Sequence, residues 1–144
     1  MPFRIETSAG GIVYKKQGDT VLWLITQHSQ NKGWGFPKGL IGDKVRNEPM
    51  EEAALREVQE EGGVKAKIIT KVDPPTQYMY KFQGYLVKKT VYYFLMEYIS
   101  GDPNDHDWEM MDAKFAIAEE VEKTLSYRTD KQAFVHAQSL LEKQ

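Results

Sequence analysis

The sequence predicts a mixed α/β or α+β fold, a sandwich in which helices cover a mixed central sheet. Three observations predict it. Runs rich in β-formers flank one internal stretch of helix formers, two further helical stretches close the chain, and no repeat or linker divides its 144 residues. We therefore expect a single domain over residues 1–144.

The first elements are expected to be a hairpin followed by a long loop. Residues 9–16 and 21–28 are rich in strand-forming side chains and are joined by the turn at 17–19. Residues 31–49 contain four glycines and two prolines, so they cannot form one regular element. A loop of this size inside a compact domain is usually functional or mobile.

Residues 49–62 are expected to form a helix, because strong helix formers occupy the whole segment. Pro49 suits a first helical position, and acidic residues crowd the first turn. Gly62 and Gly63 end the helix. The rest of the chain is expected to contain strands at 64–72, 76–83, 88–98 and 112–117, a loop at 100–108, and helices at 118–125 and 129–142.

The composition excludes several classes of protein. The chain has no cysteine, which removes thiolate catalysis, disulfides and Cys-based zinc sites. Its 19 basic and 21 acidic residues give a net charge of −2, so it lacks the basic footprint of a nucleic-acid-binding protein. The longest apolar run, 91–96, is far shorter than the roughly 20 residues that span a bilayer. We expect a cytoplasmic protein with no membrane or nucleic-acid partner.

The segment most informative about chemistry is REVQEEGGV, residues 56–64. Glu57, Glu60 and Glu61 occupy positions i, i+3 and i+4, so they share one helix face, where like charges repel. A hard divalent cation removes that repulsion, and oxygen-only ligands suit Mg²⁺ or Mn²⁺. Arg56 can hold neighbouring carboxylates in a fixed geometry. The alternative interpretation is an ordinary solvated face of a glutamate-rich helix.

The same segment resembles the signature of the Nudix hydrolases, G-x5-E-x7-R-E-U-x-E-E-x-G-U, where U is a bulky aliphatic residue. The chain matches every specified position of that pattern: Gly42, Glu48, Arg56, Glu57, Val58, Glu60, Glu61, Gly63 and Val64. The upstream segments GWGFPKG and AGGIVYKK also look like this family. The resemblance implies an α/β/α sandwich and Mg²⁺-dependent hydrolysis of a nucleoside diphosphate linked to another group, with Mn²⁺ as a substitute ion.

The resemblance also implies roles for individual residues. Glu57, Glu60 and Glu61 would be metal ligands, Arg56 their orienting partner and Glu48 a supporting carboxylate. One of the glutamates would accept the proton of the attacking water. In many members the signature glycine ends the W-x-F-P-x-G segment, which here is Gly39 rather than Gly42. The backbone carbonyl that faces the metal could therefore belong to either glycine.

Beyond the signature, the chain looks most like the asymmetrical diadenosine tetraphosphate (Ap4A) hydrolases. The segments KTVYYFL at 89–95 and WEMMDAKF at 108–115 carry this likeness, which makes Glu109 an additional candidate ligand or general base. Lysines can bind phosphate and aromatic rings can stack on a base, so the candidates for substrate binding are Lys38, Lys89, Tyr80, Tyr93 and Tyr127. The alternative for each tyrosine is a place in the core of the sheet.

The leading interpretation is a hydrolase that splits Ap4A into ATP and AMP. A nucleoside triphosphate pyrophosphatase is a second, and an RNA 5′-pyrophosphohydrolase ranks lower because that branch carries a glutamine where this chain has Lys38. A catalytically silent nucleotide-binding module is the alternative outside enzymes. The expected partner is a small nucleotide, bound by a monomer or weak homodimer.

Overall fold

The computed structural model describes residues 2–42 and 45–144, and its strands belong to one mixed sheet. The order of the main strands is β3-β2-β1-β6-β5, with β4 paired to β1 and β7 paired to β2. The strands are β1 (Phe3–Gln17), β2 (Thr20–His28), β3 (Trp34–Gly35), β4 (Lys38–Leu40), β5 (Val64–Phe82), β6 (Tyr85–Gly101) and β7 (Met110–Ile117). The helices are α1 (Met50–Gly62), α2 (Ala118–Thr124) and α3 (Arg128–Glu142), with a short 3₁₀ turn at Pro103–Asp105.

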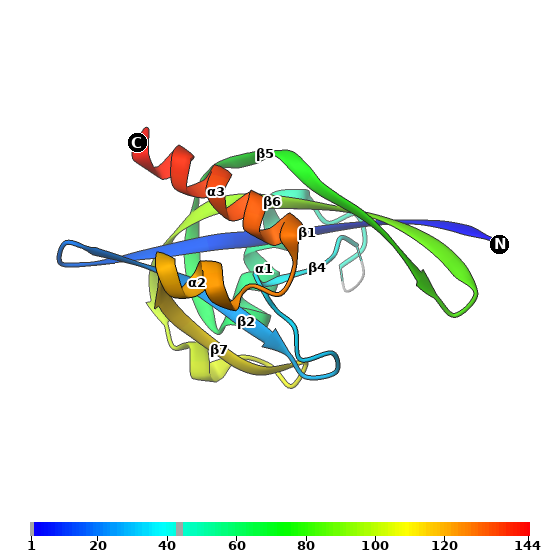
Figure 1. The fold of residues 1–144 in the computed structure, drawn as a ribbon, viewed down its shortest axis with the longest axis horizontal. Coiled ribbons are helices and arrows are strands. Elements are labelled where there is room, and N and C mark those ends of the chain that lie inside the picture. The colour runs from blue at the N-terminus through cyan, green and yellow to red at the C-terminus, as the bar shows by residue number, and fades with distance from the viewer. Residues whose placement is uncertain (1, 43–44) are drawn as a thin grey trace.

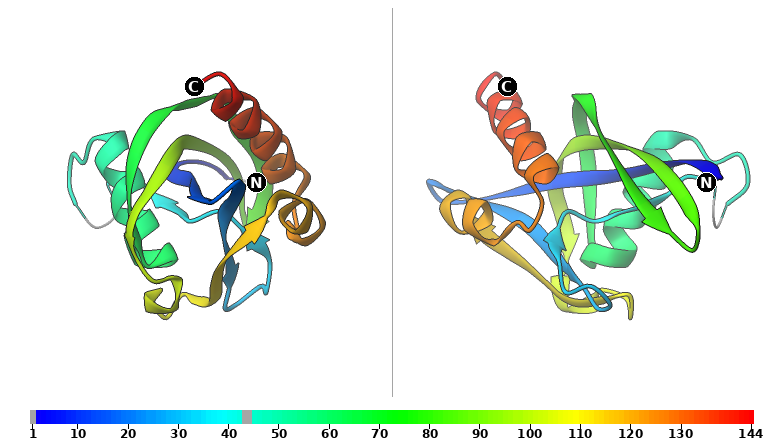
Figure 2. Two further views of the ribbon diagram at one scale, coloured as in Figure 1. Left: turned by 90° about the vertical axis from the view of Figure 1, so that its left-hand side faces the viewer. Right: turned by 45° about the vertical axis from the view of Figure 1, so that its right-hand side comes forward.

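The sheet lies between two layers of helices. Figure 1 shows α2 and α3 in front of the sheet and α1 behind it, and Figure 2 shows the same layers from two other sides. Strands β1 and β6 run parallel at the centre, whereas the other paired strands run antiparallel. The predicted sandwich with a mixed central sheet is confirmed.

Each face of the sheet carries its own hydrophobic core. On the side of α2 and α3, Phe134 packs edge-on against Trp23, with ring centroids 5.1 Å apart, and lies near Phe36. On the side of α1, Val58 packs among buried residues that include Ala9, Val13, Leu24, Ala53, Ala54, Phe94 and Met96. Burial of these apolar surfaces fixes α1 and α3 against opposite faces of one rigid sheet.

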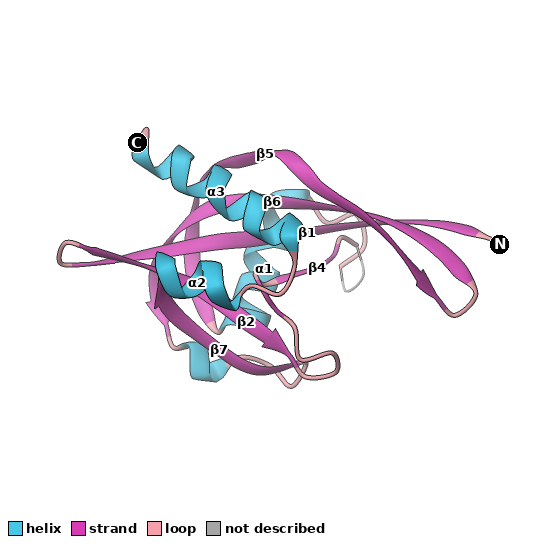
Figure 3. Ribbon diagram, in the orientation of Figure 1, coloured by secondary structure: helices cyan, strands magenta, loops and turns pink. Residues whose placement is uncertain are grey.

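The elements follow the sequence predictions with four main differences. Strand β1 begins at Phe3, six residues before the expected start at residue 9. The strands expected at 64–72 and 76–83 form one long strand, β5, which ends at Phe82 and whose register with β6 shifts at three places. Strand β6 continues to Gly101, into the segment expected to be a loop. The glycine-rich loop contains two short strands, β3 and β4, because β2 and β1 offer their backbone groups there. Figure 3 shows the extent of the strands and helices.

None of the helices within residues 2–42 and 45–144 has the length and apolar content needed to cross a membrane.

Candidate active site

A cavity of about 850 Å³ opens between α1, the β5–β6 hairpin and the start of α3. Its volume lies in the range of small-molecule sites. Of the residues proposed from the sequence, the lining includes Lys38, Gly39, Glu57, Glu61, Tyr80, Lys89, Glu109 and Tyr127. Side chains from both halves of the chain therefore meet in one pocket.

Helix α1 supplies the acidic side of this cavity. The helix ends where Gly63 adopts the left-handed conformation (φ 74°) and donates its N–H to the carbonyl of Gln59 at 3.0 Å. Ala53, Ala54 and Val58 anchor its packing face. Glu57 is only 4% exposed and Glu61 only 8%, so two charged side chains are buried with the apolar ones. Burial at this level is costly for a carboxylate unless it is paired.

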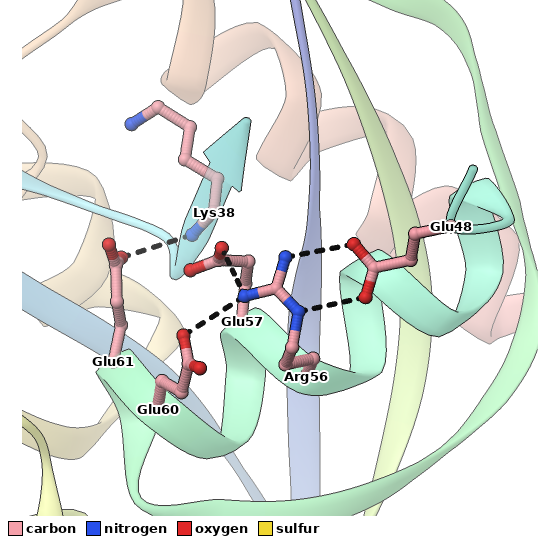
Figure 4. A network of polar contacts seen from close by, with 6 residues as sticks. All are labelled: Lys38, Glu48, Arg56, Glu57, Glu60 and Glu61. Atoms are coloured by element: carbon pink, nitrogen blue, oxygen red, sulfur yellow. Dashed lines mark hydrogen bonds and ion pairs between the residues drawn. The ribbon is translucent and has the colours of Figure 1, made fainter. Parts of the chain in front are cut away.

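Arg56 is the centre of a network that holds the carboxylates in place (Figure 4). Its Nε and Nη2 donate to the two oxygens of Glu48 at 2.8 and 2.9 Å, a bidentate pair. Its Nη1 donates to Glu57 at 2.9 Å and to Glu60 at 3.1 Å. The hydrogen bonds from Arg56 lower the pKa of Glu48. Arg56 therefore holds these carboxylates in fixed positions, and its role as their orienting partner at a metal stays a prediction.

The three helix carboxylates do not point the same way. In Figure 4, the Glu61 carboxylate lies beside the backbone of Lys38, whereas the carboxylates of Glu57 and Glu60 both point toward Arg56. The backbone N–H of Lys38 donates to Glu61 at 3.1 Å. Burial nevertheless raises the pKa of Glu61 to about 8, and this N–H only partly opposes the shift. A nearby positive charge would therefore stabilise the ionised form of Glu61.

The two candidate glycines have different surroundings. Gly39, in β4, pairs with Ala9 of β1 and backs directly onto the carboxylate of Glu57. A Cβ added to Gly42 meets nothing within 4 Å, and the backbone of this residue hydrogen-bonds to Glu48. Only Gly39 of the two lines the cavity in the described part of the chain.

The donor chemistry of the cavity suits a hard divalent cation, because Glu57 and Glu61 offer carboxylate oxygens and Gly39 offers its backbone atoms. Within residues 2–42 and 45–144, no three acidic or histidine side chains already form a metal cluster. Mg²⁺ does not require such a cluster, since it keeps several waters and binds through one or two carboxylates plus substrate phosphates. The residues present thus fit a divalent cation such as Mg²⁺, which Glu57 and Glu61 would hold.

Glu109 reaches the same cavity from the segment before β7. Its carbonyl accepts from the backbone N–H and the hydroxyl of Ser29, at 3.0 and 2.8 Å. Its own N–H donates to Asp107 at 3.1 Å, and the N–H of Asp107 donates to the carbonyl of Glu60 at 2.8 Å. These bonds tie the Glu109 loop to the end of α1.

Of the five candidate substrate residues, four line the cavity: Lys38, Lys89, Tyr80 and Tyr127. Burial and the charge of Lys38 lower the pKa of Lys89. The Tyr80 hydroxyl donates to Glu6 at 2.8 Å, which orients this ring at the cavity wall.

Tyr93 requires a correction. It shares a strand face with Lys89, as its spacing predicts, but it is 1% exposed and its ring packs on Phe36 in the core. Its hydroxyl donates to the buried carboxylate of Asp130 at 3.0 Å. The ring therefore offers no free face to a base, because it is a core residue beneath the cavity.

Tyr78 and Asp130 are among the cavity-lining residues that sequence reasoning did not select. Period-two alternation starting from Tyr80 could have found Tyr78, since residues two apart share a strand face. No local pattern marks Asp130, which is an ordinary acidic residue in the first turn of a helix.

The fold and this cavity define a class of protein: an α/β/α sandwich that presents buried helix carboxylates to a nucleotide-sized pocket. The sequence matches the NUDIX domain over residues 4–138, so the chain belongs to this family. Nudix hydrolases generally use a divalent metal ion.

Comparisons with individual proteins agree with this assignment. The protein named MutT4 of Mycobacterium tuberculosis (strain CDC 1551 / Oshkosh) is 28% identical over 144 residues. The match covers 96% of this chain and 56% of that protein, so the chain spans about half the length of the curated relative.

Among solved structures, the C. elegans Ap4A hydrolase binary complex gives a TM-score of 0.73 at 22% identity, covering 96% of this chain and 99% of that one. The NUDIX domain of Shewanella oneidensis NrtR, complexed with ADP ribose, gives 0.74 at 18% identity, covering 98% and 90%. At these identities the likeness shows a shared fold.

Proposed function

We propose that the chain is a Mg²⁺-dependent pyrophosphohydrolase that cleaves a phosphoanhydride bond of a nucleoside polyphosphate. The observation that carries the proposal is the burial of Glu57 and Glu61 on the wall of a cavity that also holds Lys38 and Lys89. Polyphosphates are strongly anionic, so their site needs both a cation-binding edge and basic side chains. Membership of the NUDIX family supports the same reaction class.

Within this proposal each residue of the site has a separate task. Glu57 and Glu61 hold the ion, and Arg56 and Glu48 fix the position of Glu57. An ion held there would supply positive charge that neutralises phosphoryl oxygens and lowers the pKa of the attacking water. Lys38 and Lys89 bind the phosphate chain. A cavity carboxylate, either of the helix pair or Glu109, accepts the proton of the water.

Ap4A is the substrate we favour, with ATP and AMP as products. The likeness of 89–95 and 108–115 to the Ap4A hydrolase branch supports this choice, as does the shared fold with the C. elegans enzyme. The test is product separation by anion exchange after incubation of Ap4A, ATP, 8-oxo-dGTP and ADP-ribose with Mg²⁺. Equal or faster turnover of a mononucleotide would contradict the preference for Ap4A, and binding without turnover would indicate a silent module.

The ion-binding assignment makes the first testable prediction. Glu57→Gln and Glu61→Gln should each lower hydrolysis by at least about 100-fold, because an amide carries no charge for the cation and accepts no proton. Initial rates and circular dichroism spectra measure the activity and the retained fold. Glu51→Gln, on the exposed side of the same helix, is the matched control and should keep the wild-type rate. Wild-type rates in the two cavity variants would reject the assignment.

A further inference from the structure

Asp130 is a buried acid that the proposed reaction does not use. It lies in the first turn of α3, is 4% exposed, and lines the cavity. Burial raises its pKa, against the opposing charge of Lys38 and the hydrogen bond from Tyr93. A polar or ionised group that is buried to this extent needs hydrogen-bond partners for its polar atoms.

The two carboxylate oxygens of Asp130 have different surroundings. Oδ1 accepts from the Tyr93 hydroxyl at 3.0 Å, which fixes the plane of the group. Oδ2 lies 2.9 Å from where a Cβ on Gly35 would be, so only glycine leaves room beside it. Among the residues that the structure describes, no hydrogen bond reaches Oδ2. This oxygen is an oriented acceptor at the cavity wall.

Aromatic side chains line the same part of the cavity. Burial and the neighbouring charge of Asp130 raise the pKa of Tyr78 to about 12, so its hydroxyl stays protonated. Tyr127 precedes α3, and its hydroxyl lies 2.6 Å from the Cβ position of Gly33. Flat rings beside a directed acceptor suit a nucleobase, which has two stacking faces and a polar edge.

The distance to the acidic helix also suits a nucleotide. Gly35 contacts Asp130 and Gly39 contacts Glu57, and only four residue steps separate the two glycines. Four steps of extended chain span at most about 14 Å. A single nucleotide can therefore place its phosphates at Glu57 and its base at Asp130.

We propose that Asp130 Oδ2 accepts a hydrogen bond from the exocyclic amine of the substrate's nucleobase, which stacks against Tyr78 and Tyr127. The site thereby selects bases that carry an amine beside the ring, such as adenine, over bases that lack one. Tyr93 is a positioning residue for this contact. The inference rests on the proposed function, since it assumes a nucleotide ligand.

The experiment compares AMP with purine riboside 5′-monophosphate, which lacks only the exocyclic amine. Neither contains a phosphoanhydride bond, so calorimetric binding is independent of hydrolysis. Wild-type protein should bind AMP about 10- to 100-fold more tightly than the analogue, the range expected of a hydrogen bond to a charged group. Equal binding of the two ligands would overturn the inference.

Asp130→Asn should reduce this preference to within about threefold. The Asn oxygen still accepts from Tyr93, which turns the amide NH₂ toward the amine of the base, donor against donor. Asp112→Asn, at an exposed position of β7, is the matched control and should keep the preference. An unchanged preference in folded Asp130→Asn would contradict the proposal.

Gly35→Ala is the second variant, and it decides the matter if Asp130→Asn does not fold. Its methyl group would occupy the space beside Oδ2 while Asp130 stays intact, so the preference for AMP should fall at least tenfold. A retained preference would reject the site. Amine-selective binding without hydrolysis of any polyphosphate would leave this inference standing and reject the proposed reaction instead.

Discussion

At the scale of single residues, Arg56 decides what the acidic helix can do. It forms ion pairs with Glu48, Glu57 and Glu60 at once, which offsets part of the repulsion between carboxylates in a partly buried region. A lysine could not replace it, because the bidentate contact with Glu48 needs a planar fork of donors. The network leaves Glu57 in a fixed orientation at the cavity.

Glu48 gives a prediction about pH. Arg56 lowers its pKa, so its contribution to stability is complete at neutral pH and is lost as the pH falls below about 4.3 and through the lowered value. Glu48→Gln should therefore reduce the free energy of unfolding by about 1–2 kcal/mol at pH 7. The difference in free energy of unfolding between Glu48→Gln and wild type should disappear near pH 3. Urea unfolding at both pH values measures it, and a gap that widens in acid would contradict the assigned ion pair.

At the scale of elements, the site depends on how closely β4 approaches α1. Gly10 and Gly11 let β1 hold the start of β4 closely: Gly11 donates its N–H to the carbonyl of Pro37 at 3.1 Å, and a Cβ on Gly10 would meet the backbone of Lys38. Gly39 then leaves room for the Glu57 side chain of α1. The approach brings the Lys38 N–H to Glu61 and the Gly39 backbone to Glu57.

This packing predicts different effects for two glycine variants. Gly39→Ala should displace the Glu57 carboxylate and lower activity at least tenfold, because a methyl group has no space there. Gly42→Ala meets no neighbour and should cost only about 1–2 kcal/mol of backbone strain at φ 79°, with activity largely kept. Steady-state rates and thermal unfolding measure the pair. The reverse ranking in activity would indicate that Gly42 faces the ion.

At the scale of the whole molecule, the sheet joins the two ends of the cavity. Core packing fixes α1 to one face of the sheet and α3 to the other, and the cavity draws side chains from both helices. The acidic site and Asp130 therefore keep a constant separation, since packed cores resist small displacements.

Ion binding should stabilise this whole assembly. Mg²⁺ at 100 times its dissociation constant should add about 2.7 kcal/mol to the free energy of unfolding, because it binds only the folded carboxylate pair. Urea titrations with Mg²⁺, and with NaCl at matched ionic strength, measure the gain. The double variant Glu57→Gln/Glu61→Gln should lose it and Glu51→Gln should keep it. An equal gain in all three proteins would place the ion elsewhere.

Local sequence patterns predict much of the fold and part of the candidate site. Helix α1 follows from its helix formers and its terminal glycines, and the i, i+3, i+4 spacing brings its glutamates to neighbouring positions. Period-two alternation places Lys89 and Tyr93 on one strand face. It cannot say how deep each one lies, and Tyr93 proved to be buried under Phe36.

The sequence by itself determined the main helices and strands, the family and the acidic helix, because these depend on spacings within a few residues. Only the tertiary structure decided which carboxylates enter the cavity, that Gly39 rather than Gly42 lines it, and that Asp130 lies beside Gly35. Those contacts join segments as distant as β3 and α3. Such contacts depend on how the two helices pack across the sheet, and no local pattern encodes that packing.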